Sequence, residues 1–252
     1  MYRWVGVLAL ASCDKFISLD RYELPDASPV GHNEDNDGFA DTDDNCPANV
    51  NNNQADRDKD SVGDACDPNP DVGNDRIAAF YTFETKDEPR WVRVAGNWSF
   101  VEDQLVYSST SATDQSMYAK NAPEISPPYV VEAHLILDEM NTVSAIDITA
   151  NLDTVPEGAS CGLVRNFQDR SFVTVYTPGS SDQTEVTAIS PAEGYRARLT
   201  VDSNMLCDVR GDVVGKGGSI AAVFTTPRAG YVGFEGRNVR VRVDYMIVYA
   251  KQ

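Results

Sequence analysis

Between residues 33 and 71 the chain carries so many carboxylates, and so few apolar side chains, that this segment cannot build a hydrophobic core of its own. It holds twelve Asp or Glu and two Lys or Arg residues, a net charge of −10 within a total of −18 for 252 residues. An acidic run of this composition is usually a solvated, disordered linker or tail. The spacing of its carboxylates predicts a different state.

Two windows of the segment place oxygen-bearing side chains at positions 1, 3, 5, 9 and 12, with a backbone carbonyl available at position 7. Calcium takes about six to eight oxygen ligands, and this spacing is typical of calcium-binding loops. In the first window Gly38 stands at position 6, where a sharp turn is needed. The expected ligands are Asn33, Asp35, Asp37, Phe39 (carbonyl), Asp41 and Asp44 in the first loop, and Asp56, Asp58, Asp60, Val62 (carbonyl), Asp64 and Asp67 in the second.

Position 12 is Asp in both loops, whereas an EF-hand has Glu, and no amphipathic helical sequence flanks either loop. The segment instead resembles a thrombospondin type 3 repeat, through Asp44-Asn45-Cys46-Pro47, Asn51, Gln54 and Gly63-Asp64-Ala65-Cys66-Asp67. The resemblance implies that the aspartates hold calcium and that Cys46 and Cys66 form a disulfide. It also draws attention to Ser61, which replaces the glycine usual at that point of the second loop.

The first twelve residues indicate that the protein is exported from the cytoplasm. Arg3 precedes the apolar stretch from Trp4 to Ala11, which is typical of a short secretory signal and too short to span a bilayer. Leu10-Ala11-Ser12-Cys13 resembles the lipobox of bacterial lipoproteins, which implies a signal peptide over residues 1–12 and lipidation of Cys13. The alternatives are a buried strand, or an ordinary signal with Cys13 as a bystander. Residues 13–32 are expected to form a flexible tether.

The cysteine count agrees with a lipid anchor, because five cysteines leave one unpaired in a secreted chain. Lipidation of Cys13 leaves two possible pairs that follow the domain boundary, Cys46 with Cys66 and Cys161 with Cys207. The anchor implies a bacterial cell envelope, with the outer membrane or the cell surface favoured over the inner membrane.

The remainder, residues 76–252, has a β pattern throughout. Its clearest strand is Val239–Ile247, where apolar residues alternate with mostly polar ones, so that one face is expected to be buried. Roughly ten or more such runs predict a mainly β fold, a two-sheet antiparallel sandwich or jelly roll. The other expected strands include Tyr129–Leu137, Ala145–Ala150, Cys161–Phe167, Phe172–Tyr176, Tyr195–Val201, Met205–Arg210, Ile220–Phe224 and Tyr231–Phe234.

Three stretches carry a resemblance to the concanavalin A-like lectin/glucanase superfamily, in its laminin G-like branch. They are the residues from Gly96 to Leu105, from Gly230 to Phe234, and Val243-Asp244-Tyr245. The resemblance spans most of residues 76–252 and implies a sandwich that binds glycan or protein.

Catalytic chemistry is not expected. His32 and His134 are the two histidines, too few for a zinc site or a convincing triad, and His134 is interpreted as a satisfied strand residue. The Glu-x-Asp-x-x-Glu motif of the glucanases is absent, and Asp147 alone is interpreted as a solvated strand position. Five aromatic residues could stack on sugars, although core packing is the expected use: Trp91, Trp98, Tyr107, Tyr118 and Tyr176.

The sequence therefore favours a calcium-binding, lipid-anchored envelope protein whose lectin-like domain binds glycan or protein in adhesion. A structural stalk and cap without a specific ligand is equally compatible, and a carbohydrate-active enzyme is disfavoured by the missing carboxylate pair. A nucleic-acid partner is not expected, because a chain with a pI near 4.3 repels phosphate backbones.

Overall fold

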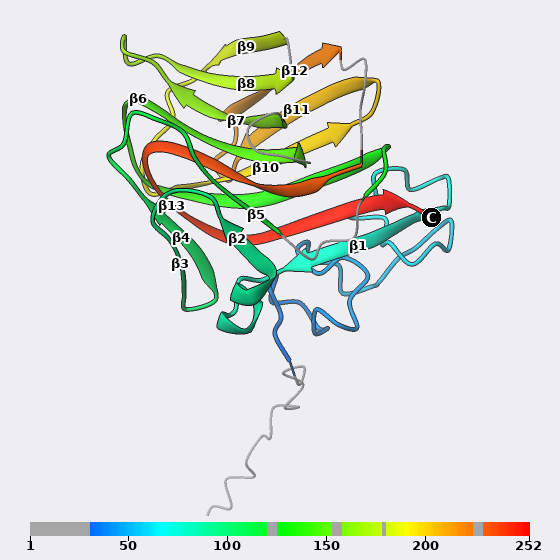
Figure 1. Ribbon diagram of the computed structural model, residues 1–252. Coiled ribbons are helices and arrows are strands. Elements are labelled where there is room, and N and C mark those ends of the chain that lie inside the picture. Colours follow the sequence, from blue (N-terminus) through cyan, green and yellow to red (C-terminus); the bar gives the residue numbers. More distant parts are fainter. Residues whose placement is uncertain (1–30, 120–124, 153–157, 178–179, 224–228) are drawn as a thin grey trace, which may run out of the picture.

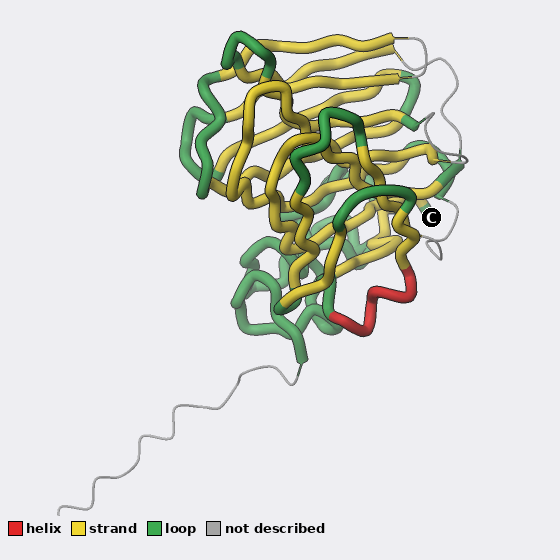
Figure 2. Tube along the Cα trace, turned by 60° about the vertical axis from the view of Figure 1, so that its left-hand side comes forward, coloured by secondary structure: helices red, strands yellow, loops and turns green. Residues whose placement is uncertain are grey.

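The computed structural model describes residues 31–119, 125–152, 158–177, 180–223 and 229–252. The predicted signal peptide, the lipidation residue Cys13 and the tether up to residue 30 lie outside the described residues. Residues 31–74 form a chain of turns without helix or strand, and a β-sandwich follows from Asp75 to Lys251 (Figures 1 and 2). Within the described ranges, no helix is long and apolar enough to cross a membrane.

The sandwich is built almost entirely from strands, as the alternating pattern predicts. One short 3-10 helix, η1 (Thr85–Arg90), interrupts them. The strands are β1 (Asp75–Tyr81), β2 (Trp91–Arg93), β3 (Trp98–Val101), β4 (Gln104–Ser108), β5 (Gln115–Ala119), β6 (Tyr129–Leu152), β7 (Ala159–Arg165), β8 (Ser171–Thr177), β9 (Ser180–Val186), β10 (Glu193–Val201), β11 (Asn204–Gly211), β12 (Gly217–Val223) and β13 (Tyr231–Lys251).

Two long strands, β6 and β13, run antiparallel through both layers of the sandwich (Figure 1). One layer, called sheet A here, has the order β12-β11-β10-β6-β13, with β1 and the β3-β4 hairpin on the outer edge of β13. The other, called sheet B, has the order β9-β8-β7-β6-β13-β5-β2. Strands β7 and β8 of sheet B pack against β11 and β12 of sheet A, which makes the fold an antiparallel sandwich.

The passage of β6 from sheet A to sheet B differs from the prediction of two separate strands, Tyr129–Leu137 and Ala145–Ala150. The polar residues between them bend the strand but do not end it, because β13 pairs along this stretch with shifts of register. Val143 and Asn238 adopt positive φ angles of 59° and 48° at the bend, and Asn238 Nδ2 donates a hydrogen bond of 2.9 Å to the Thr142 carbonyl.

The core lies between the two sheets and confirms the predicted alternation in β13 as far as Val243. Val239, Val241 and Val243 are at most 1% exposed. A shift of register then places Met246 in the core, so that Tyr245 and Ile247, predicted on the core face, lie on the outer face. The predicted pair Cys161–Cys207 forms a disulfide, which joins β7 of sheet B to β11 of sheet A.

The acidic segment packs on the outer face of sheet A, beside β1 and the end of β13 (Figure 1). Its disulfide forms between Cys46 and Cys66 as predicted. Four of its apolar residues meet the outward-facing side chains of the sheet, although the sequence pattern gave no reason to expect this contact. The apolar cluster comprises Cys46, Ala48, Val62, Cys66, Val130, Tyr245, Ile247 and Tyr249.

Candidate metal centre and ligand groove

The two predicted loops have the same local structure, repeated 23 residues apart from Asn33 to Asp56. At position 9, Asp41 Oδ1 accepts a hydrogen bond from the Glu34 N–H (2.8 Å), and Asp64 Oδ1 accepts the equivalent bond from Arg57 (2.9 Å). Asp37 and Asp60, at position 5, accept equivalent bonds from four backbone N–H groups: Phe39 (2.7 Å) and Asn51 (3.1 Å) in the first loop, and Val62 (3.0 Å) and Asn74 (2.9 Å) in the second.

The loop geometry brings predicted ligands together. In one group Asp35, Asp37 and Asp44 each place an oxygen within 4.8 Å of the others, and in a second group Asp56, Asp58 and Asp60 do the same. The carbonyl oxygens of Phe39 and Val62, expected at position 7, accept no hydrogen bond from the described residues. Each loop therefore offers three clustered carboxylates and a free carbonyl.

Several of these oxygens are buried without a hydrogen-bond partner among the described residues. They are Asn33 Oδ1, Asp35 Oδ2, both carboxylate oxygens of Asp58, and Asp67 Oδ2. Desolvation, with help from neighbouring carboxylates, raises the pKa values of Asp35 and Asp58, and it raises the pKa of Asp67 to about 6. Because buried, unpaired acceptors are costly and a divalent cation would satisfy them, the donor set fits calcium.

The residues at position 9, Asp41 and Asp64, do not belong to these carboxylate groups. Asp41 is 2.6 Å from His32 Nδ1, and Asp64 faces the Arg57 guanidinium at 3.7 Å. His32, assigned by sequence to the tether, thus belongs structurally to the first loop. Position 9 of a calcium loop often acts through a water molecule, so the ligand roles of Asp41 and Asp64 stay predictions.

A third acidic group was not predicted. Asp67 lies with Asp60 and Asp75 within 4.8 Å, and Asp75 is the first residue of β1. Asp75 already accepts hydrogen bonds from Lys251 Nζ (2.8 Å) and Asn69 Nδ2 (3.0 Å), so its charge is partly balanced. The sequence pattern ended at position 12 of the second loop and could not reach a residue contributed by the sandwich.

Ser61 adopts a φ of 80°, in the left-handed region that favours glycine. We expect Ser61→Gly to stabilise the second loop by about 1 kcal/mol, because glycine removes the Cβ strain while the backbone N–H can still donate to Asp56. A calcium titration of the variant should show an affinity gain of about fivefold. Ser99→Gly, on an exposed face of β3, is the control and should show no gain.

A groove of about 900 Å³ crosses the outer face of sheet B. Polar residues from neighbouring strands line it: Ser116 of β5, Asp147 and Thr149 of β6, Thr174 of β8, and Glu235 of β13. Tyr176, which is 44% exposed, contributes an aromatic ring. A groove of this size and polarity is suited to an extended hydroxylated ligand.

Asp147 corrects the sequence interpretation, because it is 8% exposed and not solvated. It stands opposite Glu235 on β13 and opposite Gly162 on β7, where a Cβ would lie 2.7 Å from Asp147 Oδ1. Burial, followed by repulsion from Glu235 and Asp114, raises the pKa of Asp147 to about 8. At neutral pH this carboxyl is protonated and can donate a hydrogen bond.

Two polar atoms of the groove residues lack a hydrogen-bond partner within the described chain. Thr149 Oγ1 is one, on a side chain that is 3% exposed, and Arg237 Nε is the other. Arg237 Nη1 meanwhile pairs with Asp114 at 3.1 Å. Buried polar atoms normally find partners, so these two mark a place where a ligand could supply them.

Comparison with known proteins gave no match to any family model and no match among curated proteins. Solved structures do match the fold. A legume lectin-like domain from Entamoeba histolytica gives a TM-score of 0.55 at 12% identity, covering 70% of this chain and 99% of that one. Lectin UEA-II complexed with galactose gives a TM-score of 0.53 at 10% identity, covering 70% of this chain and 99% of that one. The sandwich has a lectin-type fold.

A carbohydrate-binding module, CBM2 of the evolved Dit of Lactobacillus casei BL23 phage J-1, matches this lectin-type sandwich equally well. Its TM-score is 0.53 at 10% identity, covering 71% of this chain and 96% of that one. At these identities the likeness concerns the fold alone. It confirms the predicted two-sheet antiparallel sandwich, while the resemblance of residues 33–71 to a thrombospondin repeat stays a prediction.

Three of the five candidate aromatics serve the core of the lectin-type sandwich, as expected. Trp91, Trp98 and Tyr107 are at most 7% exposed. Tyr118 stacks on Tyr231 with ring centroids 5.4 Å apart. Of the five, Tyr176 alone lines the groove, which makes it the candidate for stacking on a sugar ring.

Proposed function

We propose that this protein binds glycan in the groove of sheet B and calcium in the acidic segment. The observation that carries the glycan proposal is the Thr149 hydroxyl, which is buried and unpartnered within a groove of other hydroxyl and carboxyl groups. Sugar hydroxyls both donate and accept hydrogen bonds, so they would satisfy Thr149 together with the protonated Asp147. The lectin-type fold supports this reading at a general level.

Calcium, in this proposal, has a structural role. The unpartnered oxygens of Asn33, Asp35 and Asp58 would receive a cation, and neutralising the carboxylates would hold the two loops in shape. Calcium ions in extracellular modules generally bind at about 10⁻⁴–10⁻³ M, an affinity suited to a constitutive metal. Calorimetry with millimolar calcium tests this role directly, and no heat of binding would contradict it.

A glycan array, followed by titration of the strongest neutral glycan, tests the groove. Thr149→Val keeps the shape of the side chain and removes one hydroxyl, so we expect binding to weaken about three- to tenfold with no loss of thermal stability. The matched control is Thr184→Val on β9, which lines neither the groove nor any other described cleft and should bind as the unaltered protein does. Absence of any binding, with or without calcium, would favour the stalk-and-cap alternative.

A second candidate function, glycoside hydrolysis, is favoured by one observation. Asp147 and Glu235 are directly opposed on neighbouring strands, and directly opposed side chains lie about 5 Å apart at their Cβ atoms. Retaining glycosidases use two carboxyl groups about 5–5.5 Å apart, a separation that side chains on such neighbouring positions can reach. We nevertheless propose binding without turnover, because the Glu-x-Asp-x-x-Glu motif of the glucanases is absent from the sequence. Release of reducing sugar, abolished by Glu235→Gln, would establish the enzyme.

We also propose that the chain is held at the cell envelope by a lipid on Cys13, as its lipobox-like sequence predicts. Cys13→Ser should move the protein from the membrane fraction of expressing bacteria to the soluble fraction. Mass spectrometry of the mature N-terminal peptide measures the same modification independently. A membrane-free wild-type protein with an unmodified Cys13 would contradict the proposal.

A further inference from the structure

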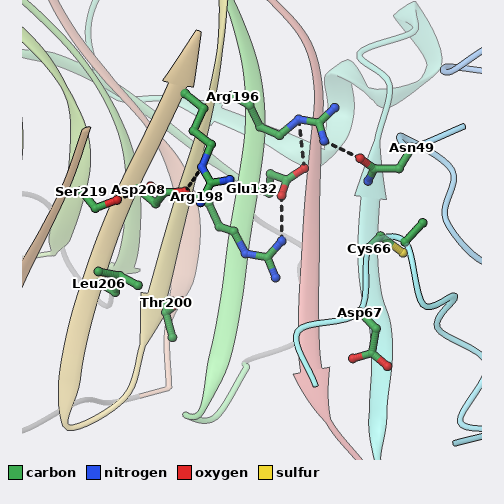
Figure 3. A pocket seen from close by; sticks show the side chains of 12 residues that line it. Asn49, Cys66, Asp67, Glu132, Arg196, Arg198, Thr200, Leu206, Asp208 and Ser219 are labelled. Atoms are coloured by element: carbon green, nitrogen blue, oxygen red, sulfur yellow. Dashed lines mark hydrogen bonds and ion pairs between the residues drawn. The ribbon is translucent and has the colours of Figure 1, made fainter. Parts of the chain in front are cut away.

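A second cleft, of about 530 Å³, lies on the outer face of sheet A, where the acidic segment packs against it (Figure 3). Asn49, Ala65, Cys66 and Asp67 of the segment form one wall. Strands β6, β10, β11 and β12 form the floor, through Glu132, Arg196, Arg198, Thr200, Leu206, Asp208, Arg210 and Ser219. The cleft exists only because the segment is docked on the sheet.

The floor gathers three arginines in a protein that is acidic elsewhere. Arg196 stands directly opposite Arg210 in the pairing of β10 with β11, and Arg198 is the next outward residue along β10. Like charges placed directly opposite each other on neighbouring strands are unfavourable. An anion bound to Arg210 would reduce that repulsion.

Their carboxylate partners do not balance this charge. Glu132 is shared, because its two oxygens pair with Arg196 Nε (3.5 Å) and Arg198 Nη1 (3.0 Å) (Figure 3). Arg210 Nε pairs with Asp208 Oδ2 at 2.8 Å. Three guanidinium groups therefore meet two carboxylates on the floor, and the third carboxylate of the cleft, Asp67, stands on the wall formed by the segment, in the acidic group with Asp60 and Asp75.

Arg198 also has donors to spare and a fixed position. Its Nε and Nη2 have no protein partner among the described residues, while the guanidinium lies 5.8 Å from the centre of the Tyr249 ring. A guanidinium held in this way is prepared to form a forked pair of hydrogen bonds with a carboxylate.

The rest of the floor suits a sugar ring. Leu206 is 41% exposed and offers an apolar surface, and Thr200 pairs opposite it on β10. The Ser219 hydroxyl, which donates to Asp208 Oδ1, retains its acceptor capacity. We propose that this cleft binds an anionic glycan, a sugar that carries a carboxylate, with that carboxylate on Arg198 and Arg210 and the ring over Leu206. The inference rests on the proposed glycan binding, but it concerns a different sheet and a different ligand charge.

Isothermal titration of the full chain, saturated with calcium, tests the cleft with a hyaluronan tetrasaccharide as the carboxylate probe. Chitotetraose serves as the neutral probe and acetate as a carboxylate without a sugar. We expect the tetrasaccharide to bind at least tenfold more tightly than acetate. Arg198→Gln should weaken it by about ten- to a hundredfold, which corresponds to the loss of a charge-assisted hydrogen-bonded pair.

Arg210→Gln provides a variant that folds safely, because this side chain is 79% exposed and has a single carboxylate partner. This change should weaken binding of the tetrasaccharide about tenfold and leave binding of chitotetraose unaffected. Thr149→Val should leave the tetrasaccharide unaffected, which separates the cleft from the groove. Three results would overturn the inference, even if neutral glycans bind in the groove. The tetrasaccharide could fail to bind, it could bind equally well to both arginine variants, or its binding could weaken in Thr149→Val.

Discussion

Removal of calcium is expected to unfold residues 33–71 while the sandwich stays folded. The segment has one small apolar contact, centred on Cys46, Val62 and Cys66, and one disulfide that closes a loop with a sequence separation of 20. Such a disulfide contributes about 3 kcal/mol. Ordering the backbone costs about 1–2 kcal/mol for each residue, so neither feature replaces the metal.

Hydrogen exchange in calcium and in a chelator measures this effect by segment. Protection of the backbone N–H groups of Asn51 and Asn74, which donate to Asp37 and Asp60, should fall by about a hundredfold or more in the chelator. The N–H groups of β10 and the central part of β13 should keep their protection. Equal protection of the segment in both conditions would contradict the role assigned to calcium.

The docking contacts predict a second consequence of chelation. Tyr245, Ile247 and Tyr249 on the outer face of sheet A are at most 3% exposed because the segment covers them. Their exposure should increase the binding of an apolar dye, and calcium should reverse it. In a Cys46→Ser, Cys66→Ser variant the segment should unfold at a higher free calcium concentration than it does in the parent protein.

Replacement of Asp147 by Asn is expected to stabilise the sandwich, and the gain should grow as the pH rises. The ordinary pKa of this group is 3.8, and burial raises it to about 8 in the folded protein. Because the folded state holds the proton more tightly, the contribution of Asp147 to the free energy of unfolding falls steadily as the pH rises from about 4 to 8. The uncharged amide avoids this loss.

Thermal unfolding at several pH values measures the difference between the two proteins. The difference in free energy of unfolding should be small at pH 4 and reach about 2–4 kcal/mol at pH 8, which corresponds to roughly 5–10 °C in the midpoint of thermal unfolding. Glu139→Gln, on the exposed side of the same strand, should show no comparable trend. A gain of equal size at both pH values would show that Asp147 is not held protonated by the fold.

Local sequence patterns predicted much of the fold. Alternation from Val239 to Val243 identified a strand with one face in the core, although a shift of register before Met246 turns the rest of the strand over. The cysteine count, taken with the domain boundary, predicted both disulfides. Spacing also put Asp35, Asp37 and Asp44 in one loop of twelve residues, and their carboxylates do lie together, whereas their role as calcium ligands stays a prediction. These predictions succeeded where the determining contacts lie close together in the sequence.

The features that sequence reasoning missed depend on long-range pairing. Asp147 and Glu235 share a face only because β6 and β13 pair in one register, so a search along a single strand could not find them. Asp75 joins Asp60 and Asp67 across the boundary between the segment and the sandwich. The docking of the segment depends on a few small apolar residues that follow no period.

The connection of the acidic segment to β1 also determines how the molecule carries mechanical tension. Tension applied from the N-terminal side is carried equally by the first loop, the second loop and the edge strand β1, whose residues pair with the end of β13 from Asp75 to Tyr81. Because the loops lie in series, each can open and lengthen the chain before the sandwich unfolds. The Cys46–Cys66 bond limits that extension, since the residues it encloses cannot be drawn out. The segment would therefore act as a short extensible element in front of a stiff sandwich.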